Sequence, residues 1–179
     1  MADLPAYLLI RSRRRRSVAI MIDADRGVVV YAPHHVEERV LAGVLEQRRA
    51  WIRKKLDQLA ALAALPKLHF AGDRDEAARL INERVALYAG KLQLFPKKVA
   101  IRDQRRRWGS CSARTGAVNL NWRLVMAPLE VLDYVVVHEL SHIKHADHSR
   151  DFWLFVSSIV PNYKLHRKWL RENGERLRG

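Results

Sequence analysis

Runs of β-branched and apolar residues open the chain, and each is about the length of a β-strand. Three such runs lie at residues 7–11, 17–22 and 28–32. The turn at 23–27, rich in Asp and closed by Gly27, predicts a hairpin between the second and third runs. From 36 to about 65 apolar residues recur at helical spacing, and Pro66 ends that pattern. Residues 1–66 are therefore predicted to form a strand, a hairpin and a long helix.

The remaining residues, 67–179, mix helical and strand-like patterns. A helix is expected over 75–88, and strands are expected at 99–102, 108–111 and 117–122, with a turn at Gly116. Three further helices are expected, from Pro128 to about 144, from near Ser149 and from near Tyr163. This order argues for an α+β fold, in which 67–179 form one compact unit preceded by the N-terminal hairpin and helix extension.

Composition adds constraints on compartment and partners. The single cysteine, Cys111, can form no disulfide within the chain, which favours a reducing compartment. No signal-like segment or apolar run of membrane-spanning length is seen, so a cytoplasmic protein without a membrane partner is expected. The net charge of +14 favours an anionic partner such as nucleic acid or another polyanion. A solvated basic surface is an equal alternative, and the oligomeric state stays open.

The strongest chemical signal is an H-E-x-x-H motif formed by His138, Glu139 and His142. On a helix, residues four apart lie one turn above each other, so both histidines can bind one ion. Glu139 is rotated by about 100° from His138, where it can reach a water on the metal without binding the metal. Zinc lowers the pKa of such a water toward about 7, and the carboxylate takes its proton. Two satisfied core histidines are the alternative interpretation.

The motif needs a helix and a third ligand. Apolar residues over 132–143 follow the helical period, whereas a strand would place the two histidines roughly 13 Å apart. His145 still belongs to the last helical turn, so its ring is not expected to converge on the ion. A downstream glutamate is the other usual ligand, but only Glu172 and Glu175 follow, in a polar tail. His148 is therefore the preferred third ligand, because a chain reversal before Ser149 would return it to the ion.

These residues occur together with the segments 107–112, 120–124, 135–142 and 148–153. In that combination the chain resembles the YgjP-like metallopeptidase domain, a group similar to the SprT-like proteases around the active site. The resemblance covers nearly the whole chain and implies a small zincin-like fold. It also implies one zinc ion at His138, His142 and His148, with Glu139 catalytic. It implies no particular substrate, although relatives include proteases that act on DNA-bound proteins.

Four further residues are weaker candidates for substrate binding or oxyanion stabilisation. Asn119 and Asn121 alternate with apolar residues in the strand at 117–122 and could face a substrate cleft, although an ordinary hairpin would give the same pattern. Tyr163 and His166 could polarise a substrate carbonyl, with core packing and surface exposure as their respective alternatives. The choice among these roles depends on how the side chains lie in the fold.

Two other features of the chain have predicted roles. Arg105, Arg106 and Arg107 could bind an anion near the cleft, with an affinity that falls steeply with salt. Cys111 could ligate zinc, but a buried, inert thiol is expected, because free cysteines usually pack as small apolar residues.

Three functions compete on these observations. The first is a zinc metallopeptidase that acts on a peptide or protein with metal-activated water and Glu139 as general base, including a nucleic-acid-associated protease. The second is a metal-dependent hydrolase of nucleotides or other phosphorylated substrates, against which the absence of a carboxylate cluster for magnesium counts. The third is a nucleic-acid-binding module with a structural metal, against which an intact Glu139 and only three ligands argue.

Overall fold

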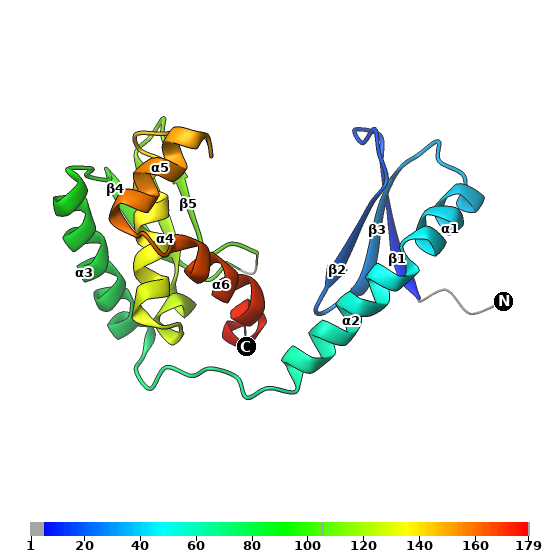
Figure 1. The fold of residues 1–179 in the computed structure, drawn as a ribbon, viewed down its shortest axis with the longest axis horizontal. Helices are drawn as coiled ribbons and strands as arrows, with labels where there is room; N and C mark the ends of the chain where they lie inside the picture. The colour runs from blue at the N-terminus through cyan, green and yellow to red at the C-terminus, as the bar shows by residue number, and fades with distance from the viewer. Residues whose placement is uncertain (1–5, 105, 179) are drawn as a thin grey trace. The chain divides into compact units, whose positions relative to one another are not determined.

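The computed structural model describes residues 6–104 and 106–178. It divides into two compact units, an N-terminal unit over Met1–Leu65 and a C-terminal unit over Pro66–Gly179 (Figure 1). Each unit contains one three-stranded sheet and helices, which gives the α+β class expected from the sequence. Among the described residues, no helix is both long enough and apolar enough to cross a membrane.

The sheet of the N-terminal unit contains β1 (Tyr7–Ser12), β2 (Ala19–Asp23) and β3 (Gly27–Pro33) in the order β1-β3-β2. Strands β2 and β3 form the predicted antiparallel hairpin, whereas β1 pairs with β3 in parallel. The turn is closed by the Asp23 carboxylate, which accepts from the backbone N–H groups of Asp25 and Arg26. Gly27 has a φ of +67°, a left-handed conformation that favours glycine.

The prediction of one long, continuous helix over 36–65 is wrong. The structure has two helices, α1 (Glu38–Gln47) and α2 (Arg49–Ala63), because Arg48 between them leaves the helical region with φ −101° and ψ 4°. Helix α1 packs Leu41 and Leu45 on the sheet, and α2 adds Ile52; all three side chains are fully buried. The apolar spacing that predicted the helices is therefore the spacing that forms this small core.

The C-terminal unit begins with α3 (Arg74–Leu92), four residues longer at its end than expected. Asp73 caps it by accepting from the Glu76 N–H at 2.8 Å, and Gln93 ends it in the left-handed region with φ 54°. A second sheet follows, with β4 (Lys98–Arg102), β5 (Gly109–Ser112) and β6 (Ala117–Asn121) in the order β4-β6-β5. Strand β6 is therefore central, and β5, antiparallel to it, lies at the edge.

Four more helical segments complete the unit, namely η1 (Trp122–Met126), α4 (Leu129–Ser141), α5 (Arg150–Ile159) and α6 (Tyr163–Leu177). Helix α4 lies in the middle of the unit and packs against α3, α5, α6 and β5 (Figure 1). Its valines are buried on several sides, with Val136 and Val137 fully inaccessible. Burial on all sides explains why a helix forms from a segment whose valines favour strand.

A salt bridge joins α4 to α3. Asp133 accepts two hydrogen bonds of 2.6 Å from the guanidinium of Arg84 and one of 3.0 Å from the hydroxyl of Tyr88. Since the pair is largely shielded and bidentate, it orients α4 more firmly than an exposed ion pair would. The helix that carries the H-E-x-x-H motif is thus held by both apolar packing and a directional polar contact.

Candidate metal centre

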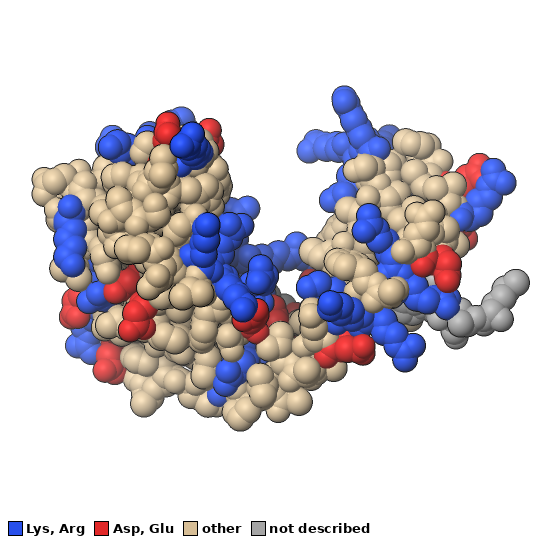
Figure 2. Space-filling model, in the orientation of Figure 1, with Lys and Arg blue, Asp and Glu red and all other residues tan. Residues whose placement is uncertain are grey.

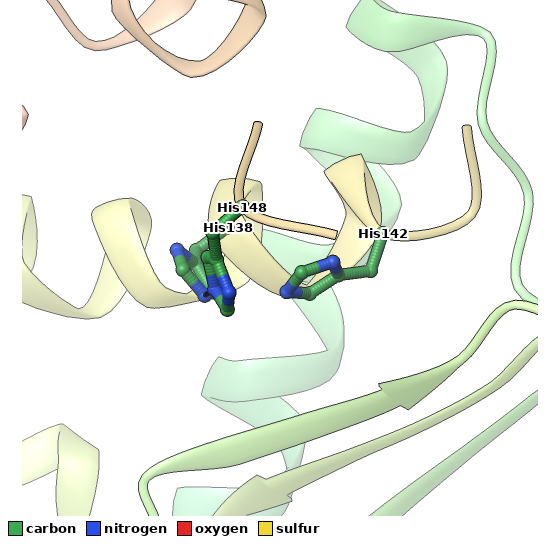
Figure 3. Close-up of side chains that lie close together, drawn as sticks. All are labelled: His138, His142 and His148. Atoms are coloured by element: carbon green, nitrogen blue, oxygen red, sulfur yellow. Dashed lines mark hydrogen bonds between the residues drawn. The ribbon is translucent and has the colours of Figure 1, made fainter. Parts of the chain in front are cut away.

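Three histidine side chains converge at the end of α4. The potential ligand atoms of His138, His142 and His148 all lie within 4.8 Å of one another (Figure 3). The Nε2 atoms of His138 and His148 are 3.1 Å apart, close to the roughly 3.3 Å expected between two nitrogens bound tetrahedrally to one ion at about 2.0–2.1 Å. No other group of three such ligands was found in the described part of the chain.

The local fold explains why these rings meet. His138 and His142 are one turn apart on α4, which ends at Ser141 with His142 as its C-cap. The chain then reverses, and Ser149 caps α5 by accepting from the Phe152 N–H. The reversal brings His148 back to the end of α4, as its position before a helix cap suggested.

Three contacts fix the orientation of two of the candidate ligand rings, those of His142 and His148. The Nδ1 of His142 lies 3.0 Å from the backbone oxygen of His145, so a proton on Nδ1 is donated to that carbonyl and Nε2 is left free for a metal. Trp153 stacks on His148 with ring centroids 5.5 Å apart. Phe152, which is fully buried, stacks on His142 at 4.6 Å and forms the floor of the site. His145 thus contributes its main chain to the site.

The electrostatics favour neutral imidazoles. Burial lowers the pKa of His138 to about 3, and the neighbouring His142 and His148 add to that effect. The pKa of His148 is also lowered, again mainly by burial. Neutral imidazole is the form that binds a divalent transition metal, so the donor set fits zinc or a similar ion. The chain's own folding prepares the ligands in the protonation state that coordination requires.

Glu139 is buried beside this cluster. Removal of its carboxyl from water raises its pKa from 4.5 to about 7, an effect that the nearby Arg107 guanidinium partly opposes. Its side chain lies against the backbone of Gly109 in the edge strand β5. A carboxyl with a pKa near neutrality, adjacent to a metal site, is suited to accept and return a proton at physiological pH.

A pocket of about 480 Å³ opens next to His138 and Glu139. Tyr134, one turn before His138 on α4, forms part of its wall, and burial raises the pKa of its hydroxyl to about 12. Arg167 and Arg171 line the same pocket from α6. The sequence reasoning missed all three. The i, i+4 spacing of Tyr134 and His138 was a usable signal, whereas the approach of α6 depends on tertiary packing.

The two asparagines suggested for the cleft have other contacts. Asn121 is fully buried; it donates to the backbone oxygens of Gln104 and Arg107 and accepts from the Arg123 N–H. In this position it shapes the loop before β5 and caps η1. Asn119 lies in the central strand β6 and donates to the Ser110 hydroxyl at 3.3 Å. The edge strand of this sheet that contacts α4 is β5, and its first residue, Gly109, lines the pocket.

The remaining candidates lie at different distances from the cluster. Tyr163 stacks on Trp153 at 5.1 Å and so belongs to the aromatic layer behind His148. His166 has Tyr134 as its ring neighbour at 6.3 Å and is not in contact with the three ligand rings among the aromatic pairs described. Of the three arginines, Arg107 lines the pocket, Arg106 does not, and Arg105 lies outside the described residues.

Cys111 lies in β5 and is partly buried. Burial, with a contribution from the charge of Glu139, raises the pKa of its thiol to about 11. It is not among the ligand atoms that converge with the three histidines. The geometry thus gives Cys111 the character of a protonated packing residue.

Part of the chain is similar to a known protein family and to a solved structure. Residues 71–173, more than half of the chain, match the YgjP-like metallopeptidase domain. Among solved structures, the metallopeptidase zymogen of Pyrococcus abyssi, abylysin, is 22% identical; the match covers 51% of this chain and 93% of that one, with a TM-score of 0.46. No curated protein matches the chain. The resemblance seen in the sequence is therefore confirmed over residues 71–173, and the chain belongs to the YgjP-like metallopeptidase family, as a peptidase-like hydrolase with a divalent-metal site.

Proposed function

We propose that the chain is a zinc-dependent metallopeptidase in which His138, His142 and His148 hold one ion and Glu139 is the general base. The observation that carries this proposal is the convergence of three imidazoles from α4 and the following reversal, with the Nε2 atoms of His138 and His148 3.1 Å apart. Three imidazole ligands leave a coordination position free, as a catalytic zinc site requires and a closed structural site does not.

Zinc is proposed over other divalent ions because of the donor set. Imidazole nitrogen suits zinc, copper, iron and nickel, whereas magnesium and calcium prefer oxygen ligands. When bound, a zinc ion supplies Lewis acidity, which makes water more acidic and polarises a peptide carbonyl. The lowered pKa of His138 keeps its ring neutral and available at any pH above about 3.

Glu139 would move the proton. Its carboxylate Oε atoms accept a proton from the attacking water and return it to the nitrogen of the leaving amine. In the metal-free protein its pKa is about 7, and a nearby dication would lower it and so favour the basic form. The contact with Gly109 holds the side chain in one place, which a base needs if it is to remain within reach of the water.

Tyr134 replaces the earlier candidates as the proposed donor to the substrate carbonyl oxygen. It lines the pocket together with His138 and Glu139, and its raised pKa of about 12 keeps the hydroxyl protonated. A neutral O–H donor aimed at developing negative charge stabilises an oxyanion. Tyr134→Phe removes only that donor and is expected to lower kcat with little change in zinc content.

The function is tested with the zinc-loaded full-length protein, an unstructured protein substrate and, in parallel, nucleoside triphosphates, each with and without DNA. We expect peptide-bond cleavage and no release of phosphate or pyrophosphate. Glu139→Gln should retain one zinc per chain, measured by elemental analysis, and lose turnover. Phosphate or pyrophosphate release without proteolysis, or a chain that binds no transition metal, would contradict the proposal.

A further inference from the structure

The pocket beside the metal centre carries an excess of positive charge. Among the described residues, four arginines line it, together with two carboxyl groups, those of Glu139 and Glu175. Glu175 is already paired with Arg178 at 2.6 Å. Figure 2 shows Lys and Arg side chains over α6 on the face in view. Three guanidinium groups therefore share the pocket with one carboxyl, that of Glu139, which has no ion-pair partner among the described residues.

Two of these arginines have no acidic partner among the described residues. Neither Arg107 nor Arg167 has a carboxylate within 4 Å in the described ranges. Arg171 has only a long contact of 3.9 Å with Glu172, and both of these side chains are mostly exposed. Guanidinium groups in a protein cannot lose their charge. Their positive charge therefore remains available to a ligand that enters the pocket.

Arg167 is nevertheless held in place. Its guanidinium carbon lies 5.2 Å from the ring centroid of Trp153, the residue that also stacks on His148. Arg167 also lines the same pocket as His138 and Glu139. Stacking on an aromatic face leaves the N–H edges of a guanidinium free for hydrogen bonding. Arg167 thus presents fixed donors close to the reacting group.

The pocket lining also contains apolar side chains. Trp108, Val135 and Leu170 are among them, and Gly174 comes so near Trp108 that a Cβ there would lie 3.1 Å from the indole. A ligand that suits both the charged and the apolar parts of this lining has a carboxylate on a short apolar stem. Acidic peptide residues have this form, and carboxylates match the planar fork of arginine. Membership of a metallopeptidase family favours a peptide as the carrier of that group.

We propose that this pocket binds a carboxylate of the peptide substrate next to the scissile bond, so that the enzyme selects acidic peptides, with Arg167, Arg171 and Arg107 as the specificity residues. This inference rests on the proposed peptidase function and adds the substrate class. The carboxylate can come from an Asp or Glu side chain or from the end of the substrate chain, since both present the same group. Adjacency to the scissile bond follows because His138 and Glu139 line the same pocket.

The test uses zinc-loaded full-length protein and matched quenched peptides that carry Glu, Gln or Lys on either side of the scissile bond. A second pair ends at that position in a free carboxylate or an amide. We expect kcat/KM to be higher for the carboxylate peptides by at least about tenfold over their neutral partners, and lower still for Lys. The pair that shows the preference identifies the source of the carboxylate.

Variants of α6 make the assignment specific. Arg167→Gln should bring the ratio of kcat/KM for Glu and Gln peptides toward one, and Arg167→Lys should retain part of it, because the charge remains without the fork. Lys168→Gln, an exposed neighbour outside the pocket, is the matched control and should keep the wild-type ratio. Circular dichroism and zinc content establish that each variant is folded and loaded.

The possible failures are separable. Cleavage of all peptides at equal rates would overturn the pocket assignment and leave the peptidase function intact. An unchanged Glu-to-Gln ratio in folded Arg167→Gln and Arg171→Gln variants would overturn the role of these arginines. No peptide cleavage by the zinc-loaded protein, with turnover of a nucleoside triphosphate instead, would overturn both the pocket assignment and the proposed function.

Discussion

The backbone of Gly109 lies against the side chain of Glu139, so closely that a Cβ at residue 109 would be 2.6 Å from both Cγ and Oε1 of the glutamate. Gly109 begins the edge strand β5, and Glu139 lies in the middle of the metal-binding motif on α4. The two elements therefore meet at the residue proposed to move the proton. This contact leads to the first prediction.

Gly109→Ala should leave the fold and the zinc site intact and lower kcat/KM by about 100-fold or more, because the methyl group displaces the carboxylate from its position. The clash is with a flexible side chain, so the glutamate moves and the strand does not. Activity and zinc content are measured on the same samples. Gly90→Ala in α3, where a Cβ meets nothing within 4 Å, is the control and should retain activity. Full activity of Gly109→Ala would show that the position of Glu139 is not critical.

Substitution of His148 and of His145, one at a time, should distinguish a metal ligand from a residue that only orients a ligand. His148→Ala removes one of three proposed ligands and should weaken zinc binding by more than about 100-fold. His145→Ala should keep normal affinity, because only its backbone oxygen contacts His142. Competition with a chromophoric chelator measures both affinities. Equal loss in the two variants would indicate damage to the reversal rather than loss of a ligand.

The Arg84–Asp133 pair should matter for stability more than any exposed pair. Asp133→Ala leaves the largely shielded Arg84 without its carboxylate and is expected to cost about 2–4 kcal/mol of unfolding free energy. Glu172→Ala, which removes a long and exposed contact with Lys168, should cost less than about 0.5 kcal/mol. Urea unfolding of both variants provides the comparison. Similar effects of the two substitutions would contradict the structural role of the α3–α4 salt bridge.

Glu139 should make the stability of the metal-free protein depend on pH in a defined direction. Its pKa is raised in the folded state, from 4.5 to about 7, so the folded protein binds its proton more tightly than the unfolded chain does. The contribution of this group is favourable below about pH 4.5 and is lost as pH rises through 7. His138, with its pKa lowered to about 3, acts in the opposite direction between about pH 3 and 6.5, which masks the effect in the wild-type protein.

The difference in unfolding free energy between wild type and Glu139→Gln isolates the carboxyl. In the presence of chelator, this difference should shift against the wild type by about 2 kcal/mol between pH 5 and 7.5. Chemical denaturation at several pH values measures it. A difference that does not change with pH would mean that the carboxyl is not buried as the structure describes.

Much of the metal centre could be predicted from the sequence, because its residues are close together in the chain and are placed by local structure. His138 and His142 depend only on helical spacing, and His148 depends on one reversal ended by a helix cap at Ser149. The N-terminal hairpin was likewise encoded by a local turn. The break at Arg48 was missed, since apolar periodicity continues across a change of backbone angles that leaves the pattern intact.

The substrate side of the site could not be predicted in this way. Tyr163 and His166 were proposed from their place in the chain, yet the pocket is lined by Tyr134, Arg167 and Arg171. Packing between residues about 35 positions apart determines which face of α6 contacts α4. No short sequence motif predicts such a contact. Asn121 was suggested for the cleft because it fits the polar–apolar alternation of a strand. Its amide instead donates to backbone oxygens of the loop before β5.

The path of the chain from His142 to His148 has a consequence for how the metal is kept. Two of the proposed ligands, His138 and His142, lie on or at the end of a helix buried in the core, and the third, His148, follows a short bend held by a few polar contacts. Binding of a metal ion by all three histidines would link that bend to α4. Substitutions in the bend are expected to change how long an ion stays bound, while Glu139 on α4 keeps its position. The affinity for the metal and the position of the proposed general base can therefore vary independently.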